Sequence, residues 1–506
     1  MNRFRYLTLS QLVTLILILS SLLSLKFGIN TSYSSMLVVL MCGLSVIILS
    51  AVLLLFIPGA GSVFAVLFLV FATAFMYASF RSTPFPYPYG DFVKVKLKLY
   101  SDLRVKGNMV QFTARVKDVS IGQPGGQGKQ SIRFPNSKVL LNLPAVKSMP
   151  QRGDTVYVTG VFMDLPFEKS DSYARYLVSK SVGAIFEGSS EGLKVLKYSK
   201  KYSIINISNR LKKYVKKVND RLLLWPQSEF AFSIFTGNRD GLPPFIIETF
   251  RNSGTMHLLA VSGLHIGFLA MFFFQILRVL RIDRTVSYIL LVGVVVFYMI
   301  FIGDAPSVKR ASIMVLLGVF IFIFDRDRNY LNVLSITFNI LWAINPLTIT
   351  NPGFLLSFSA TFAIFFLAPH FMKMFKSIMP PKMAGLLAVS SAVQIYLFPV
   401  LLSYFGVFPY ITIVANLPIV PLAGISLGLE MVYLALYPVF LPLAVIIAET
   451  NLFVISTILR LNMVFSRVPP LSVRGFPPYL IILYFILVTA VILFLTRKRS
   501  AYPEAG

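Results

Sequence analysis

The run "VSYILLVGVVVFYMIFIG" at 286–303 holds 18 consecutive residues without a charged side chain. A helix needs about 20 predominantly apolar residues to cross the hydrocarbon core of a bilayer. Similar runs recur along the 506-residue chain, which is 56% hydrophobic and 13% charged, whereas a soluble domain carries about 25% charged residues. Long continuous runs favour helices over barrel strands, which alternate in short segments. The sequence therefore predicts an α-helical polytopic membrane protein.

Charge predicts the topology of the spans. Basic segments at 278–284, 325–328, 373–382 and 496–500 fall on one side of the membrane if the spans alternate, and this is also the N-terminal side. Because Lys and Arg collect in cytoplasmic loops, we expect about twelve crossings with both termini cytoplasmic, and an uncleaved anchor at the N-terminus. Pro418 and Pro421 interrupt one predicted span, and 451–467 is expected to be an outer, surface-lying helix. The expected spans are 7–25, 36–57, 61–80, 256–280, 286–303, 308–324, 331–347, 353–369, 384–404, 409–424, 426–446 and 479–496.

Residues 81–200 differ in pattern from the rest of the chain. Five short runs alternate apolar and polar residues, which is typical of half-buried strands. Five strands in about 120 residues suit a small closed barrel, and an OB-like barrel is the preferred interpretation. The fold class is thus a helical membrane protein with an inserted extracytoplasmic all-β (OB-like) domain. The runs are "FVKVKLKLY", "MVQFTARVKDV", "KVLLNLP", "DTVYVTGVF" and "GAIFEG", with a short helix expected at "YARYLVSKSVG".

Residues 201–227 predict an amphipathic helix on the membrane surface. Apolar residues recur at helical spacing from Ile204 to Leu222, and lysines fill the opposite side. The segment 81–227 holds 26 basic and 10 acidic residues, so +16 of the formal net charge of +27 falls there. The expected domains are a three-span anchor (1–80), the β domain (81–200), the surface helix (201–227), a membrane domain (228–497) and a cytoplasmic tail (498–506).

One motif places polar side chains, which are unfavourable in the hydrocarbon core, at the start of a predicted span. The stretch "RNSGTMHLLAVSGLHIG" at 251–267 contains His257, Ser262, Gly263 and His265. Irregular backbone survives at membrane depth only where it lines a cavity or is buried in protein. These residues could line a pore, or neighbouring helices could satisfy their polar groups. Ser262 and His265 could also form a nucleophile–base pair, although nothing in the sequence orients that histidine.

Two further motifs hold polar groups near the ends of spans. "IGDAPSVKRASI" at 302–313 contains Asp304, Lys309 and Arg310 beside Pro306; such charges usually face a wet cavity, or they snorkel to the interface. In "ANLPIVPL" at 415–422, Asn416 ahead of two prolines suggests a discontinuous helix. Glu430 and Gln394 could line a path or hydrogen-bond a neighbouring helix.

The sequence lacks the motifs of several kinds of enzyme and metal site. The chain has no P-loop and no HExxH pattern, and its three histidines make a poor supply of metal ligands. Cys42 is the only cysteine, so an intramolecular disulfide is excluded. We therefore expect no cofactor, no metal site and no catalytic residue.

The motifs together resemble the ComEC family, the inner-membrane channel of bacterial natural transformation. The likeness lies in "FTGNRDGLPPFIIETFRNSGTMHLLAVSGLHIGF", "GDAPSVKRASIMVLL", "NPGFLLSFSATFAI" and "YFGVFPYITIVANLPIVPL". It implies transport of single-stranded DNA into the cytoplasm. The family motif positions carried over are His257, Ser262, Gly263, Leu264, His265, Pro306, Ser307, Arg310, Asn416 and Pro421.

The resemblance also sets an expectation about partners. Many family members continue into a metallo-β-lactamase-like domain, whose metal motifs are absent from this sequence. A separate nuclease, a DNA receptor and a cytoplasmic helicase-like motor are therefore expected, besides membrane lipid and the DNA strand itself. A transporter of a small anionic metabolite or lipid-linked precursor stays as the alternative.

DNA phosphates are drawn to surfaces rich in Lys and Arg. Lys94, Lys96 and Lys98 alternate with apolar residues, so they share one strand face and could follow a DNA backbone. Protection of an edge strand against aggregation would explain the same lysines. Inside the membrane, the residues expected to line a passive path are His257, His265, Asp304, Lys309, Arg310 and Asn416.

Overall fold

The computed structural model divides the chain into two compact units. One comprises Met1–Lys217 with Leu269–Phe354, and the other Val218–Phe268 with Leu355–Gly506. The spans expected at 7–25, 36–57 and 61–80, and most of the one at 479–496, lie outside the described residues, as does most of the expected helix at 173–183. The residues described are 90–473, 484, 487 and 488, apart from gaps at 91, 102, 107–108, 122–129, 133–137, 145–148, 164, 166–176, 178–179, 181, 190–192, 199–202, 304 and 324–328.

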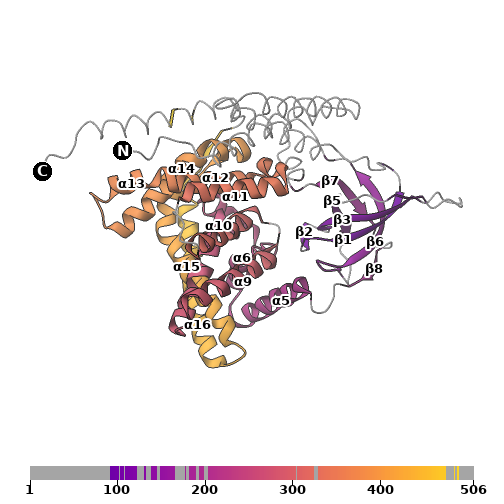
Figure 1. The fold of residues 1–506 in the computed structure, drawn as a ribbon, viewed down its shortest axis with the longest axis horizontal. Helices are drawn as coiled ribbons and strands as arrows, with labels where there is room; N and C mark the ends of the chain where they lie inside the picture. The colour runs from indigo at the N-terminus through magenta and orange to yellow at the C-terminus, as the bar shows by residue number, and fades with distance from the viewer. Residues whose placement is uncertain are drawn as a thin grey trace, which may run out of the picture. The chain divides into compact units, whose positions relative to one another are not determined.

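The predicted β domain is present, and the five alternating runs form its five long strands (Figure 1). Three short strands, which the sequence did not reveal, join them: β2, β4 and β8. The bounds are β1 Phe92–Leu99, β2 Arg104–Lys106, β3 Met109–Ile121, β4 Gln130–Ile132, β5 Lys138–Pro144, β6 Thr155–Met163, β7 Val182–Gly188 and β8 Lys194–Lys197.

The five long strands close into a barrel with OB topology. The hydrogen-bonded order is β1-β3-β5-β7-β6, and β6 returns to pair with β1. All these pairs are antiparallel except β5 with β7, which run parallel. If the five long strands β1, β3, β5, β6 and β7 are numbered 1 to 5 in chain order, the order around the barrel is 1-2-3-5-4-1. This is the Greek-key arrangement of an OB-fold.

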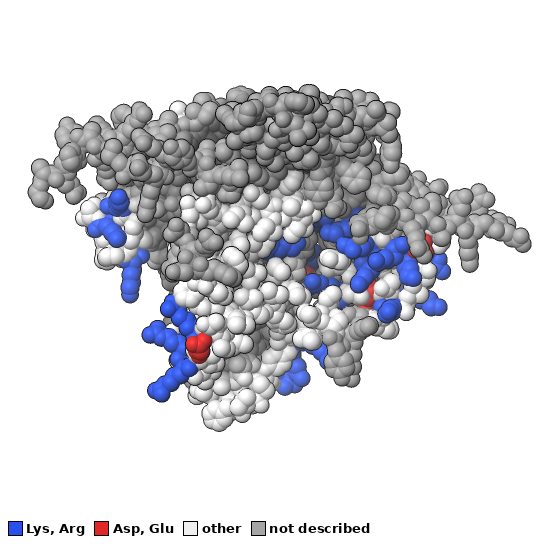
Figure 2. Space-filling view, in the orientation of Figure 1, with Lys and Arg blue, Asp and Glu red and all other residues white. Residues whose placement is uncertain are grey.

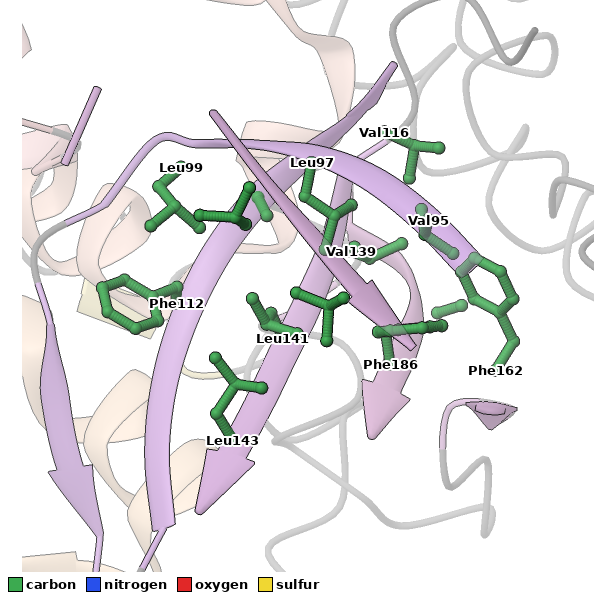
Figure 3. Close-up of a cluster of buried hydrophobic side chains, with 14 of the residues drawn as sticks. Val95, Leu97, Leu99, Phe112, Val116, Val139, Leu141, Leu143, Phe162 and Phe186 are labelled. Carbon is green, nitrogen blue, oxygen red and sulfur yellow. The ribbon is translucent and has the colours of Figure 1, made fainter. Parts of the chain in front are cut away.

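Alternating side chains fill the barrel. Along β1, every second residue from Val93 to Leu99 is buried and the lysines between them point outward. Phe162 and Phe186 meet edge to face, with ring centroids 4.7 Å apart. Figure 3 shows how apolar side chains from β1, β3, β5, β6 and β7 converge in this core.

The predicted surface helix is α5, Ile204–Leu222. It ends before Pro226, which cannot continue an α-helix. Ile204 and Ile207, on the predicted apolar face, are exposed, whereas Ser208 and Asn219 are buried. The packed face of α5 is therefore partly polar, which the hydrophobic pattern did not indicate.

The segment before the first expected span of the membrane domain folds as short helices. α6 (Gln227–Thr236) and α7 (Pro244–Asn252) are followed by the 3-10 turn η1 (Met256–Leu258) and then by α8 (Gly263–Val279). The span expected from residue 256 therefore begins seven residues later, at Gly263, because Ser262 caps the helix there.

The next helices match the predicted spans closely. They are α9 (Arg284–Ile302), α10 (Pro306–Ile323), α11 (Tyr330–Ile344) and α12 (Pro352–Phe366), with the 3-10 turn η2 (Pro346–Thr350) before α12. Asp283 begins α9 by accepting hydrogen bonds from the backbone N–H groups of Thr285 and Val286. Hydrogen bonds from the N–H groups of Val286 and Thr285 lower the pKa of the Asp283 carboxyl below its usual value.

The last helices correct two predictions. α15 (Thr412–Leu436) runs without a break through Pro418 and Pro421, so the expected discontinuous helix and the separate spans 409–424 and 426–446 are wrong. The expected surface helix at 451–467 is instead the second half of α16 (Leu441–Phe465), a long apolar helix. α15 can continue through its two prolines because neighbouring groups can hydrogen-bond the backbone carbonyls that proline leaves without a partner. α13 (Ala368–Phe375) and α14 (Pro381–Phe405) precede them, and a two-stranded ribbon joins β9 (Val407–Phe408) to β10 (Leu471–Ser472).

Five helices in the described part of the chain are long and apolar enough to cross a membrane: α9, α10, α14, α15 and α16. A sixth span results if α12 and α13, which meet at a bend of 48°, are counted as one. The structure is that of a multi-pass helical membrane protein carrying an OB-type barrel.

Candidate functional site: a basic barrel face and a polar membrane motif

The three lysines of β1 share the outer face of the barrel, as the sequence predicts. Lys94 and Lys98 are exposed and Lys96 is half-buried, while the residues between them are buried. Figure 2 shows Lys and Arg side chains gathered over the barrel strands with few acidic residues among them. This face presents positive charge.

Strand register extends this charge across three strands. Lys98 on β1 is opposite Arg115 on β3, and Arg115 is opposite Lys138 on β5. Because neighbouring strands lie about 4.8 Å apart, the three form a continuous line across the barrel, here called the basic row. The sequence places Arg115 and Lys138 in strands but does not reveal that they line up with Lys98.

Two tyrosines lie against this charge. The Arg115 guanidinium carbon is 5.2 Å from the Tyr100 ring centroid, and Lys138 Nζ is 5.4 Å from the same centroid. Tyr157 lies on the neighbouring strand β6. The centroid of its ring is 5.2 Å from Lys94 Nζ and 6.0 Å from Lys96 Nζ, which are both on β1. Such distances permit cation–π attraction, which holds flat aromatic surfaces beside the cations.

The position of Tyr100 matches the binding face of OB-folds. That face is formed by barrel strands 2 and 3 together with the loop between strands 1 and 2. Here these elements are β3, β5 and the segment from Tyr100 to the start of β3. Arg115, Lys138 and Tyr100 are the residues that sequence reasoning missed, since only the pairing register brings them together.

In the membrane domain, buried polar side chains hold the first motif in place. Ser253 and Thr255, at the end of α7, are both buried, and both donate hydrogen bonds to Asn462 Oδ1 on α16. Thr412 Oγ1, at the start of α15, lies 3.1 Å from the Ser253 carbonyl oxygen and 2.6 Å from the Pro409 carbonyl oxygen, and its single proton donates to one of the two. Between Ser253 and Thr255, Gly254 adopts φ +76°, a left-handed conformation that favours glycine. The motif backbone is thus fixed against α15 and α16.

Ser262 and His265 cap the start of α8. Ser262 Oγ accepts a hydrogen bond from the Leu264 N–H at 3.2 Å, and His265 Nδ1 accepts one from the Ser262 N–H at 3.2 Å. This reciprocal pattern is a capping box in which histidine occupies the place usual for Glu or Gln. Ser262 Oγ also lies 3.0 Å from His265 Nδ1, so the two side chains are in direct contact as well.

The two histidines have different surroundings. His265 is 3% exposed. The His257 side chain is exposed on η1, and its Nδ1 lies 3.3 Å from the Gly254 carbonyl oxygen. The two histidines do not share one face of a single helix, because His257 lies on η1, and a loop separates η1 from α8, which carries His265.

The second motif begins α10. Pro306 is its first residue, Ser307 and Lys309 are half-buried, and Arg310 is 7% exposed. Asp304 lies outside the described residues. In the same unit, Arg152 Nη1 from the barrel donates a hydrogen bond to the Ile300 carbonyl oxygen near the end of α9, at 3.2 Å. The prediction that these residues and the histidines line one path stays a prediction.

Asn416 and Glu430 lie on the same long helix, α15. Asn416 Nδ2 donates to Ser390 Oγ on α14 at 3.5 Å. Glu430 is fully buried and accepts a hydrogen bond from Asn219 Nδ2 at 2.9 Å. The sequence indicates Glu430 as an intramembrane polar group, but its partner lies 211 residues away along the chain. Among the described residues, no group of three or more His, Cys, Asp and Glu side chains is placed to hold a metal ion.

A multi-pass helical bundle with an OB-type barrel and a capped polar motif defines the class of this molecule. Comparison with known families gives its membership: the model of the Competence protein family matches residues 234–498, and the chain belongs to this family. The chain is also similar to ComE operon protein 3 of Bacillus subtilis (strain 168), with 29% identity over 224 residues. That alignment covers 44% of this chain and 27% of the relative. No solved structure matches significantly.

Proposed function

We propose that this protein is a channel of the bacterial cytoplasmic membrane through which single-stranded DNA enters the cell. Membership of the Competence protein family supports a role in DNA uptake. The observation that carries the proposal is Tyr100 lying against the basic row on the OB binding face. OB-folds bind single strands by combining a basic groove with aromatic stacking. In this proposal the barrel lies outside the membrane and both termini lie inside.

The barrel acts first, by collecting the incoming strand. The phosphates of the strand follow Lys98, Arg115 and Lys138, and a base stacks on the Tyr100 ring. Both interactions tolerate any sequence, because every nucleotide carries a phosphate and every base has a π-face. A surface that reads no sequence suits a protein that takes up arbitrary DNA.

The membrane helices then provide the path, and conduction is passive. The driving force comes from a cytoplasmic helicase-like motor, while a separate DNA receptor and a separate nuclease act outside. In this proposal Ser262 and His265 serve as a helix cap, because each accepts a hydrogen bond from a backbone N–H at the start of α8. On this account the chain is not an enzyme.

Deletion of the gene tests the proposal. Labelled DNA should still bind the cell surface, while the DNase-resistant fraction inside the cell should fall to background. Complementation with the wild-type gene should restore entry. A variant in which Lys98, Arg115 and Lys138 are replaced by Gln should insert into the membrane normally but restore little entry. Normal DNA entry in the deletion strain would overturn the proposal and return the small-anion transporter to consideration.

A further inference from the structure

A chain of fully buried polar groups connects the end of α5 to α15. Asn219 Nδ2 donates to Glu430 Oε1 at 2.9 Å, and the Tyr433 hydroxyl donates to Asn219 Oδ1 at 2.8 Å. Asn219, Glu430 and Tyr433 are each 0% exposed. Asn451 on α16 is also fully buried and lies beside Tyr433. All four belong to the same compact unit.

The second oxygen of the Glu430 carboxyl group has no hydrogen-bond donor. Among the described residues, Glu430 Oε2 is buried and unpartnered, as are Ser426 Oγ and both polar atoms of the Asn451 side chain, Oδ1 and Nδ2. Ser426 precedes Glu430 by four residues on α15, so both side chains lie on one helical face. A buried carboxylate oxygen that accepts no hydrogen bond is costly, because it has lost its contacts with water without replacing them.

No cation neutralises Glu430 among the described residues. The charged residues of α14, α16 and the last six residues of α5 are all exposed, and Lys216 on α5 is half-buried; the exposed ones are Lys217, Asp220, Arg221, Lys382, Glu449 and Arg460. Glu229 on α6 is half-buried and lies against Gly241. Arg221, two residues after Asn219, donates instead to the Tyr437 hydroxyl at 2.9 Å. A charged carboxylate here would be buried with a single neutral donor, which is strongly unfavourable.

We propose that Glu430 is a proton-binding site, and that the bound proton keeps the end of α5 latched onto α15 through Asn219. A protonated carboxyl group carries its O–H on Oε2, so this oxygen is no longer a charged acceptor without a donor, and its O–H can donate to Ser426 Oγ on the same face of α15. Oε1 remains the acceptor for Asn219. When the proton passes to water, the carboxylate becomes charged. It is then unstable in a buried site where it accepts only one hydrogen bond. The Asn219 contact then opens and water reaches the carboxylate.

The latch joins two parts of the chain that matter for transport. α5 is the segment that follows the barrel in sequence, and α15 carries Asn416 of the third motif. Proton occupancy of Glu430 thus controls whether the end of α5 is attached to a membrane helix. This inference goes beyond the proposed function, because it concerns the protein in the absence of DNA.

Infrared spectroscopy tests the bound proton directly. We expect wild-type protein in lipid nanodiscs at neutral pH to show a carboxylic-acid C=O stretch that is absent from Glu430→Gln. The matched control is Glu449→Gln on α16, which removes an exposed carboxylate and should leave this band unchanged. In the wild type, the band should disappear as the pH is raised. An identical band in wild type and Glu430→Gln, or a difference confined to the carboxylate region, overturns the proposal.

Spin-label distances test the latch. Labels are placed at Leu224→Cys, just after α5, and at Val439→Cys, just after α15, with Cys42 replaced by Ser; both label sites are exposed. We expect a narrow distance distribution at neutral pH that broadens at high pH. Adding Glu430→Gln, which mimics the neutral acid, should keep the distribution narrow at both pH values. An unchanged wild-type distribution, or equal broadening in the Gln variant, refutes the latch. Neither measurement depends on DNA uptake, so failure of the proposed function would not affect the result.

Discussion

Gly254 lies against Thr412 so closely that a β-carbon at Gly254 would overlap the Thr412 hydroxyl oxygen. Gly254 also has φ +76°. The left-handed conformation costs an ordinary residue about 1–2 kcal/mol, and the overlap adds to that cost. The motif loop can therefore reach α15 only because this position has no side chain.

Replacement of Gly254 by Ala should lower the thermal unfolding temperature of the purified protein and reduce the amount inserted in the membrane. The matched control is Gly267→Ala in α8, where a β-carbon meets nothing within 4 Å. Since Ala is favoured over Gly in a helix by about 0.5–1 kcal/mol, that control should be neutral or slightly more stable. Differential scanning fluorimetry of both variants decides the matter. Equal stability of the two would mean that the Gly254 contact is unimportant.

Tyr100→Ala should weaken binding of single-stranded DNA to the full-length protein. Loss of one stacking partner costs about 1–3 kcal/mol, which corresponds to roughly a 5- to 150-fold rise in Kd. The matched control is Tyr198→Ala, which removes a tyrosine that is 72% exposed in the same domain but lies outside the basic row. Fluorescence anisotropy with labelled oligonucleotides measures both. Equal affinity of the two variants would exclude Tyr100 as a stacking platform.

Binding should also depend on salt through the basic row. Each phosphate contact contributes about 0.7 to the slope of log K against log salt for single strands. Replacing both Lys98 and Lys138 by Gln should therefore reduce the magnitude of that slope by about 1.4, equally for different base compositions. Lys194 and Lys197 on β8 are exposed lysines of the same domain and provide a charge-matched control pair. A similar reduction for the control pair would assign the effect to overall charge and not to the row.

The sequence predicted the barrel because its information is local. The alternation from Val93 to Leu99 indicates which side of the strand is buried. Five such strands are expected to close into a barrel, because closure leaves no strand edge unpaired. Register is not local: nothing near Lys98 in the chain identifies Arg115 or Lys138 as its neighbours. The OB-like fold could thus be predicted, while the residues of its binding face could not.

Among the described residues of the membrane domain, the hydrophobic pattern predicted most helix positions but not all helix boundaries. Pro418 suggests a break, yet α15 continues through it because neighbouring helices can stabilise the freed backbone. The role of Ser262 in starting α8 follows from a local capping pattern, but the use of His265 in that pattern is unusual. The contact of Asn219 with Glu430 depends on tertiary packing and has no sequence signal.

The capping interpretation of Ser262 makes a prediction that separates it from catalysis. Ser262→Asn should retain DNA entry, because Asn is as good an N-cap as Ser. Ser262→Ala should lose about 1 kcal/mol of stability, since the Leu264 N–H then loses its side-chain acceptor. If Ser262 were a nucleophile, both variants would lose DNA entry, because neither Asn nor Ala can replace a reactive hydroxyl. Entry of DNase-resistant DNA into cells carrying each variant, normalised to the amount of protein in the membrane, is the measurement. Loss of entry in both variants at normal protein levels would favour a chemical role for Ser262.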